Sequence, residues 1–173
     1  MKYSIVYSSN GGNTRLLADT VLEYLDKNKC SYFGQTDALA LEADIIFIGF
    51  WTIKGECDSL TSKLLKSLDN QKIVLFGTAG FGLSEEYFNE IINATKKYIP
   101  AGAEILNTFM CQGKMKERVL EKYEAMRKEN PNNPNIEMMI KNYNMALSHP
   151  DSNDLNNLRN IIKNIGDSYG ITL

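Results

Sequence analysis

The sequence predicts a single α/β domain in which a doubly wound sheet of five parallel strands is covered by helices on both faces. Segments rich in β-branched and aromatic residues alternate with segments of helical periodicity along the chain, which is typical of a parallel sheet. The uninterrupted apolar run at residues 45–50 indicates a strand buried on both faces. With 173 residues, 43% of them hydrophobic, the chain can form one core, so we expect one domain over residues 1–173.

The first half of the chain is expected to supply three strands. Tyr3, Ile5 and Val6 are typical strand residues, whereas Leu17 and Val21 recur at helical spacing. The link between the second and third strands is short enough for only a turn or two of helix. The expected elements are a strand at residues 2–8, a helix at 13–29, a strand at 30–34, helical turns at 39–43 and a strand at 45–50.

The second half repeats this alternation and then departs from it. Asp58 or Ser59 can cap a helix, Ser84 can start another, and Pro100 and Gly102 end it. The expected elements are a helix at residues 59–68, a strand at 72–76, a helix at 84–98, a strand at 104–111, an appended helical pair within 115–150 and a last helix at 154–165. A strand order of 2-1-3-4-5 would bring the carboxyl ends of strands one, three and four around one crevice, where we expect the functional site.

The turn at residues 8–14 carries the strongest functional signal. It joins the first strand to the first helix, whose free N–H groups and dipole favour an anion. Glycines let the backbone curl closely, and hydroxyl and amide side chains can donate hydrogen bonds. The candidate phosphate-binding residues are Ser8, Ser9, Asn10, Gly11, Gly12, Asn13 and Thr14. No Lys follows the glycines, which argues against a nucleoside triphosphatase, and an ordinary strand-to-helix turn is the alternative interpretation.

This loop resembles the phosphate loop of flavodoxins, Ser/Thr-x-Thr-Gly-Asn-Thr, through Ser9, Gly12, Asn13 and Thr14. Gly11 stands where many flavodoxins carry a Thr, so one hydrogen bond to phosphate is missing. The resemblance implies a flavodoxin-like fold and FMN as cofactor. A finer similarity, to small flavodoxins associated with bilirubin reductase, involves Gly49-Phe50-Trp51, Lys54-Gly55, Phe76-Gly77-Thr78, Cys111-Gln112-Gly113-Lys114 and Ser148-His149-Pro150.

Two further loops are expected to meet the flavin ring. Trp51, just past the third strand, is a candidate for stacking on the ring, with core packing as the alternative. Phe81 is a candidate for a second contact. By the same resemblance, the loop of Thr52, Lys54 and Gly55 contains a peptide that reorients on reduction, a role we assign to Gly55, and Thr78, Ala79 and Gly80 supply backbone contacts to the pyrimidine edge. For Gly55 a plain turn glycine is the alternative.

Charge and residue content narrow the range of binding partners and sites that the protein can have. Glu56, Asp58, Glu85 and Glu86 are expected to surround the two ring loops with negative charge and to steer a basic partner, or else to form solvated loop surface. The net charge of −2 without a basic cluster gives no support for nucleic-acid binding. The three widely spaced cysteines indicate free thiols rather than a metal site or disulfides. The longest apolar run is too short to predict a membrane span, and we expect a cytoplasmic protein.

Together with these patterns, the resemblance to flavodoxins implies an FMN-dependent, low-potential electron-transfer protein that passes single electrons to or from a larger redox enzyme, such as a reductase. No nucleophile, base and orienting group can be assembled from the sequence, which favours a carrier. The alternative is an FMN-dependent NAD(P)H or quinone-type reductase acting on a small molecule. A helical insertion that covers the flavin would favour that alternative.

Overall fold

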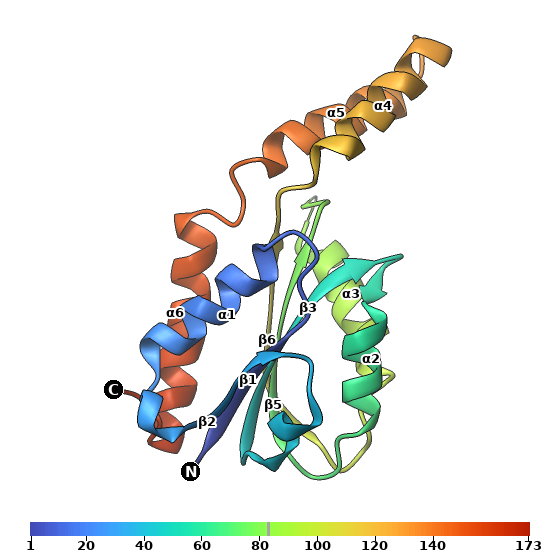
Figure 1. Cartoon of the computed structure of the whole chain (residues 1–173). Helices are drawn as coiled ribbons and strands as arrows, with labels where there is room; N and C mark the ends of the chain where they lie inside the picture. Colours follow the sequence, from blue (N-terminus) through green and yellow to red (C-terminus); the bar gives the residue numbers. More distant parts are fainter. Residues whose placement is uncertain (83) are drawn as a thin grey trace.

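The computed structural model describes residues 1–82 and 84–173 and contains a parallel sheet with helices on both faces (Figure 1). The sheet order is β2-β1-β3-β5-β6, and a short strand, β4, pairs antiparallel with β3. The strands are β1 (Tyr3–Tyr7), β2 (Cys30–Gln35), β3 (Ile45–Ile53), β4 (Glu56–Cys57), β5 (Lys72–Ala79) and β6 (Glu104–Gln112). Apart from β4, this is the predicted order 2-1-3-4-5, and the predicted fold class is confirmed.

Two helices cover each face of the sheet. The helices are α1 (Asn13–Tyr24), α2 (Ser59–Lys66), α3 (Glu85–Lys96), α4 (Glu117–Glu129), α5 (Pro134–Ala146) and α6 (Ser152–Tyr169), with 3-10 turns η1 (Lys27–Lys29) and η2 (Ala38–Glu42). Side chains alternate along β3, so Phe47 packs with α1 and α6, whereas Ile48 and Phe50 pack with α2 and α3. Both faces are therefore apolar, as the run at residues 45–50 predicts.

Local capping explains where several helices begin and end. The carboxylate of Asp58 accepts hydrogen bonds from the N–H groups of Leu60 and Thr61 and fixes the start of α2. A reciprocal capping box between Asp151 and Asp154 starts α6, which begins earlier and ends later than predicted. Helix α1 is shorter than predicted because the chain turns extended at Leu25.

The third strand is longer than predicted, because it continues past residue 50 into a hairpin with β4. Trp51 thus lies inside β3, in register with Thr78 of β5, rather than beyond the strand. Ile53 pairs with Glu56, and Lys54 and Gly55 form the turn between them with φ of 52° and 81°. Positive φ at both central residues is what a type I′ hairpin requires.

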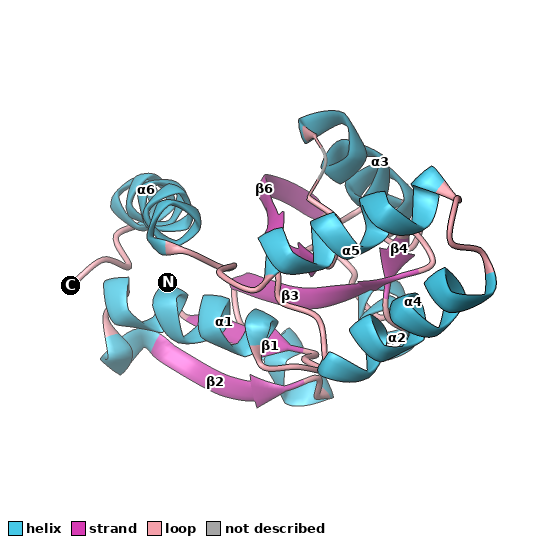
Figure 2. Ribbon diagram, turned by 90° about the horizontal axis from the view of Figure 1, so that it is seen from above, coloured by secondary structure: helices cyan, strands magenta, loops and turns pink. Residues whose placement is uncertain are grey.

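The appended pair, α4 and α5, stands above the carboxyl ends of the strands (Figure 1). It has its own small core of Tyr123, Ile136, Ile140 and Tyr143. Seen from above, the pair lies on the side of the sheet that carries α2, α3 and β4, away from α6 (Figure 2). Among the described residues, no helix is long and apolar enough to cross a membrane.

Candidate functional site

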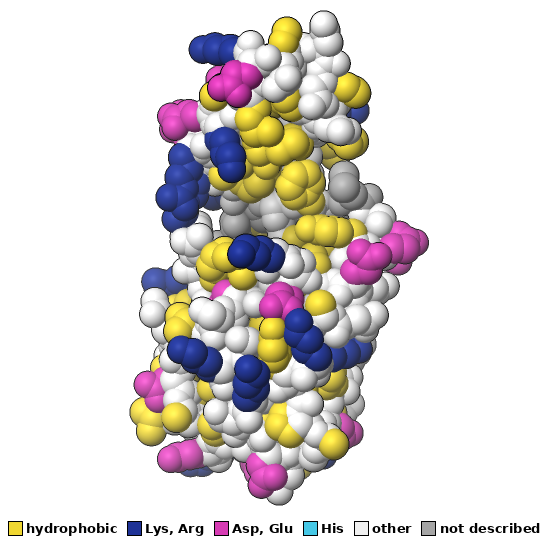
Figure 3. Space-filling view, turned by 90° about the vertical axis from the view of Figure 1, so that its right-hand side faces the viewer, with side chains coloured by type: hydrophobic (Ala, Val, Ile, Leu, Met, Phe, Trp, Pro, Cys, Tyr) yellow, Lys and Arg dark blue, Asp and Glu magenta, His cyan; other side chains and the backbone are white. Residues whose placement is uncertain are grey.

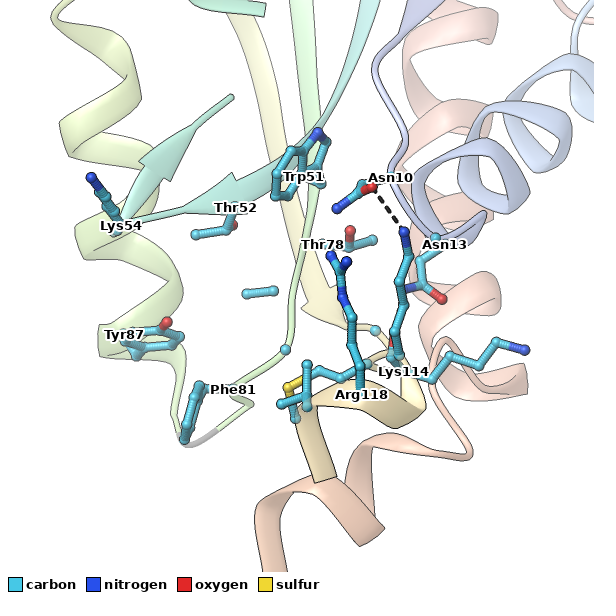
Figure 4. Close-up of a pocket in the computed structure, with 18 residues that line it drawn as sticks. Asn10, Asn13, Trp51, Thr52, Lys54, Thr78, Phe81, Tyr87, Lys114 and Arg118 are labelled. Atoms are coloured by element: carbon cyan, nitrogen blue, oxygen red, sulfur yellow. Dashed lines mark hydrogen bonds between the residues drawn. The ribbon is translucent and has the colours of Figure 1, made fainter. Parts of the chain in front are cut away.

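A pocket of about 460 Å³ opens where the carboxyl ends of β1, β3 and β5 meet, at the crevice predicted from the strand order. Its walls come from the loop after β1, the β3–β4 hairpin, the loop after β5 and the segment after β6 (Figure 4). The predicted site residues that line it are Asn10, Gly11, Asn13, Trp51, Thr52, Lys54, Gly55, Thr78, Ala79, Gly80 and Phe81. Ser8, Ser9, Gly12 and Thr14 are not among its lining residues.

The loop at residues 8–14 is closed by its own hydrogen bonds. The Ser9 hydroxyl oxygen accepts from the N–H of Gly12 at 3.1 Å and from that of Arg15 at 3.4 Å, so it ties the loop to the first turn of α1, whose N-cap is Gly12. Gly12 has φ of 90°, in the left-handed region that favours glycine, and lines a second hollow of about 250 Å³. The neighbouring Gly11 has backbone angles that any residue can adopt, and a Cβ added there would meet only Asn13 Nδ2, at 4.0 Å.

Thr14 lies behind the loop rather than in the pocket. Its side chain is 1% exposed, and its hydroxyl donates to the Phe50 carbonyl at 3.2 Å and lies 3.1 Å from the Thr78 hydroxyl. Ser8 is likewise buried, and its N–H donates to the Gly49 carbonyl. These contacts hold β1, β3 and β5 together at the pocket floor, and the direct hydrogen bonds from Ser8 and Thr14 to an anion stay predictions.

Aromatic side chains stand on opposite sides of the pocket. Figure 4 shows Trp51 beside Asn10 at one rim and Phe81 with Tyr87 at the other. Between them, the hydroxyl oxygen of Thr52 is buried and has no hydrogen-bond partner among the described residues. A polar ligand atom in the pocket would satisfy that hydroxyl.

The β3–β4 hairpin is fixed from outside the pocket. Lys97 and Tyr98 donate hydrogen bonds to the Glu56 carboxylate, and these bonds hold its pKa below the ordinary value. The N–H of Cys57 donates to the hydroxyl of Thr95 at 3.0 Å. Glu56 is thus paired on the α3 side, and Asp58 is buried as the cap of α2.

The electrostatic expectation for the site is corrected by these contacts. Glu56, Asp58, Glu85 and Glu86 do not line the pocket, and no described lining residue is acidic. The charged lining residues are instead Lys54, Lys114, Lys116 and Arg118. The charges that line the pocket are therefore positive, whereas Glu85 and Glu86 lie exposed in the first turn of α3, outside the lining.

Sequence reasoning missed the wall that follows β6. The missed residues of this wall are Gly113, Lys114, Met115, Lys116, Arg118 and Val119, and Tyr87 of α3 was missed as well. The segment folds back because the N–H of Gly113 donates to the Ala79 carbonyl and Asn13 Nδ2 donates to the Lys114 carbonyl. The basic residues at 114, 116 and 118, directly after a strand whose carboxyl end borders the predicted crevice, were the available signal.

The fold and the pocket define a class: doubly wound α/β proteins that bind a ligand at the carboxyl ends of the strands, beside a glycine-containing turn before a helix. The flavodoxin domain family matches residues 4–163, and the chain belongs to this family. The chain is 44% identical over 172 residues to a flavodoxin-like domain-containing protein BilS of Clostridium symbiosum, and the match covers 90% of each chain. A BilS protein of Clostridioides difficile is 34% identical over 169 residues, covering 95% of this chain and 96% of the relative.

Solved structures agree on the fold. The crystal structure of oxidised flavodoxin 2 from Bacillus cereus aligns with a TM-score of 0.59 and 18% identity, covering 97% of this chain and 99% of that one. A Streptococcus pneumoniae flavodoxin aligns with a TM-score of 0.61 and 15% identity over the same shares. At such identities the likeness concerns the backbone alone.

Flavodoxins bind FMN, which confirms the predicted cofactor, and the pocket fits it. The cavity has the size of a small-molecule site, the unpartnered Thr52 hydroxyl offers a hydrogen bond, and aromatic faces flank the space. Cationic side chains and the start of α1 suit a phosphate. When bound, FMN supplies the capacity to accept and donate electrons one or two at a time.

Proposed function

We propose that this protein is an FMN-dependent electron carrier that exchanges single electrons with a larger redox enzyme. Membership of the flavodoxin family supports FMN-type electron transfer in general. The observation that carries the proposal is the pocket lining: its described residues are aromatic, small, amide or cationic, or the apolar Met115 and Val119, and include no Asp, Glu, His or Cys. A pocket without such acid–base or nucleophilic groups suits binding and tuning of a cofactor better than transformation of a substrate.

Each wall has a role in this proposal. Asn10, Gly11 and Asn13, at the start of α1, bind the phosphate end of FMN. Trp51 and Phe81 flank the ring, and the backbone of residues 78–80 meets its polar edge. Gly55 suits a peptide that reorients, because a glycine adopts positive and negative φ at similar cost.

The test uses the purified protein loaded with FMN. We expect one FMN per chain, reduction by dithionite without oxygen, and rapid one-electron delivery to a ferric haem protein as acceptor. NAD(P)H alone should not reduce the bound flavin. A bilirubin-type reductase is the first partner to add, because of the similarity to small flavodoxins associated with that enzyme.

A second candidate function is an FMN-dependent NAD(P)H or quinone-type reductase. It is favoured by the pocket lining, because Met115, Arg118 and Val119 of the appended segment contribute to it. Apolar side chains also gather on the upper part of the molecule, where the α4–α5 pair stands above the sheet (Figure 3). Rapid steady-state oxidation of NAD(P)H by a quinone, without any other protein, would replace the carrier function with this one.

A further inference from the structure

The positive charges of the pocket are gathered on one side. Lys114, Lys116 and Arg118 line it together with Asn10, Gly11 and Asn13 of the phosphate loop. Figure 4 shows Lys54 well apart from them, on the β3–β4 hairpin. None of the three cations after β6 forms an ion pair with a carboxylate in the described part of the chain. These cations thus border the loop end of the pocket and form no ion pair among the described residues.

Lys116 is held against the phosphate loop. Its Nζ donates to Asn10 Oδ1 at 3.0 Å, the hydrogen bond drawn in Figure 4. An ammonium group has three N–H donors, so two remain for an anion in the pocket. Lys116 is also the residue before the first turn of α4, and its backbone φ of −68° and ψ of 148° fix the direction from which the side chain enters.

The donors that the loop itself offers an anion are neutral, among them the N–H groups at the start of α1. The N–H of Gly12 is taken by the Ser9 hydroxyl, the Thr14 hydroxyl is buried behind the loop, and position 11 has no side chain. An FMN phosphate carries about −1.5 to −2 charges at pH 7. Neutral donors leave the charge of this dianion unmatched, and Lys116 is the cation bonded to the loop.

We propose that Lys116 is a specificity-determining residue of the cofactor site, which supplies the charge that makes the pocket prefer FMN to riboflavin. The inference rests on the proposed function, because it concerns the same pocket. The inference goes beyond the proposed function because it assigns phosphate recognition to the appended helical segment in place of a hydroxyl at position 11. Lys114 and Arg118 add to the same positive potential.

The test compares Kd values for FMN and for riboflavin, measured by quenching of flavin fluorescence. Lys116→Ala should weaken FMN binding about tenfold or more, as expected for loss of one charge-assisted hydrogen bond, and leave riboflavin binding within about twofold. Lys116→Gln, which keeps a donor for Asn10 but no charge, should lose FMN affinity similarly. Lys122→Ala, an exposed lysine on α4, is the matched control and should bind both flavins like wild type.

Salt dependence gives a second readout. Wild-type affinity for FMN should fall as NaCl rises from about 50 mM to about 500 mM, and the Lys116 variants should show a shallower fall. Equal losses for the two flavins, or a Gln variant that binds FMN like wild type, would overturn the inference while leaving FMN binding intact. A wild-type protein that binds no FMN would overturn the proposed function itself. Circular dichroism of each variant without flavin controls for folding.

Discussion

The side-chain amide of Asn142 on α5 donates to the carbonyl oxygen of Gly80 in the loop after β5, with an Nδ2–O distance of 3.1 Å. Gln112 at the end of β6 completes the arrangement, because its Nε2 donates to the same carbonyl at 2.9 Å and to Asn142 Oδ1 at 3.0 Å. The Met115 side chain packs against Gly80, where a Cβ would lie 2.7 Å from its sulfur. The appended pair is thereby coupled to the wall of the pocket.

Removal of the Asn142 amide should therefore loosen both the pair and the pocket. We expect Asn142→Ala to lower the free energy of unfolding by about 1–3 kcal/mol, because it removes an acceptor from the buried Gln112 amide and a donor from the Gly80 carbonyl. FMN binding should weaken as well. Urea unfolding and flavin titration measure the two effects, with exposed Asn144→Ala on the same helix as control. Unchanged FMN affinity in Asn142→Ala would show that the loop holds its shape without α5.

A side chain at position 11 should improve the phosphate loop. Because Gly11 has no positive φ and open space around its Cβ position, Gly11→Thr can adopt the native backbone. Its hydroxyl would add a hydrogen bond to a charged phosphate, so we expect FMN affinity to rise by up to about tenfold with riboflavin affinity unchanged. Gly12→Thr is the contrasting variant, since φ of 90° there strains any β-branched residue. Weaker FMN binding by Gly11→Thr would mean that the ligand approaches the loop too closely for a side chain.

Thr14 should contribute to stability rather than to flavin selection. Loss of its hydroxyl in Thr14→Val leaves the buried Thr78 hydroxyl without this partner and the Phe50 carbonyl without this donor. We expect a cost of about 1–3 kcal/mol in the free energy of unfolding and an unchanged ratio of FMN to riboflavin affinity. A selective loss of FMN affinity would restore the direct phosphate contact that the sequence predicts.

These residues show how far sequence reasoning reaches. The order and faces of the strands follow from local patterns, such as the apolar run of β3 and the caps at Asp58 and Ser84, which the structure confirms. The partners of Thr14 and Asn142 depend on contacts across 64 and 62 residues, respectively, and no local pattern encodes them. The basic residues after β6 can be seen in the sequence, but only the folded chain shows that residues 114–118 return to the loop after β1.

Alkaline pH should destabilise the protein partly through Cys57. Burial raises the pKa of this thiol to about 11. In the unfolded chain the pKa of this thiol is near 9, so above pH 9 the unfolded chain loses the thiol proton before the folded protein does. The contribution of the buried neutral thiol to stability is therefore complete below pH 9 and is lost as pH rises toward 11. Urea midpoints should therefore fall between about pH 9 and pH 11, and Cys57→Ala should show a smaller fall than wild type. Parallel pH profiles for the two proteins would exclude this thiol as a cause.

The β3–β4 turn should tune the redox potentials through Gly55. Its φ of 81° lies in the left-handed region, yet a Cβ there would touch nothing within 4 Å, so a substitution acts through backbone strain alone. Gly55→Val should cost the turn about 1–2 kcal/mol, whereas Gly55→Asn, a residue that tolerates this region, should cost less.

If reorientation of this peptide favours the one-electron reduced protein, a residue that resists it makes the first reduction step harder and the second easier. The expected shifts are tens of millivolts, at about 59 mV per tenfold change, and larger for Val than for Asn. Potentiometry of the three FMN-loaded proteins measures both steps, and potentials that are equal in all three would remove Gly55 from the mechanism and leave it as a turn residue.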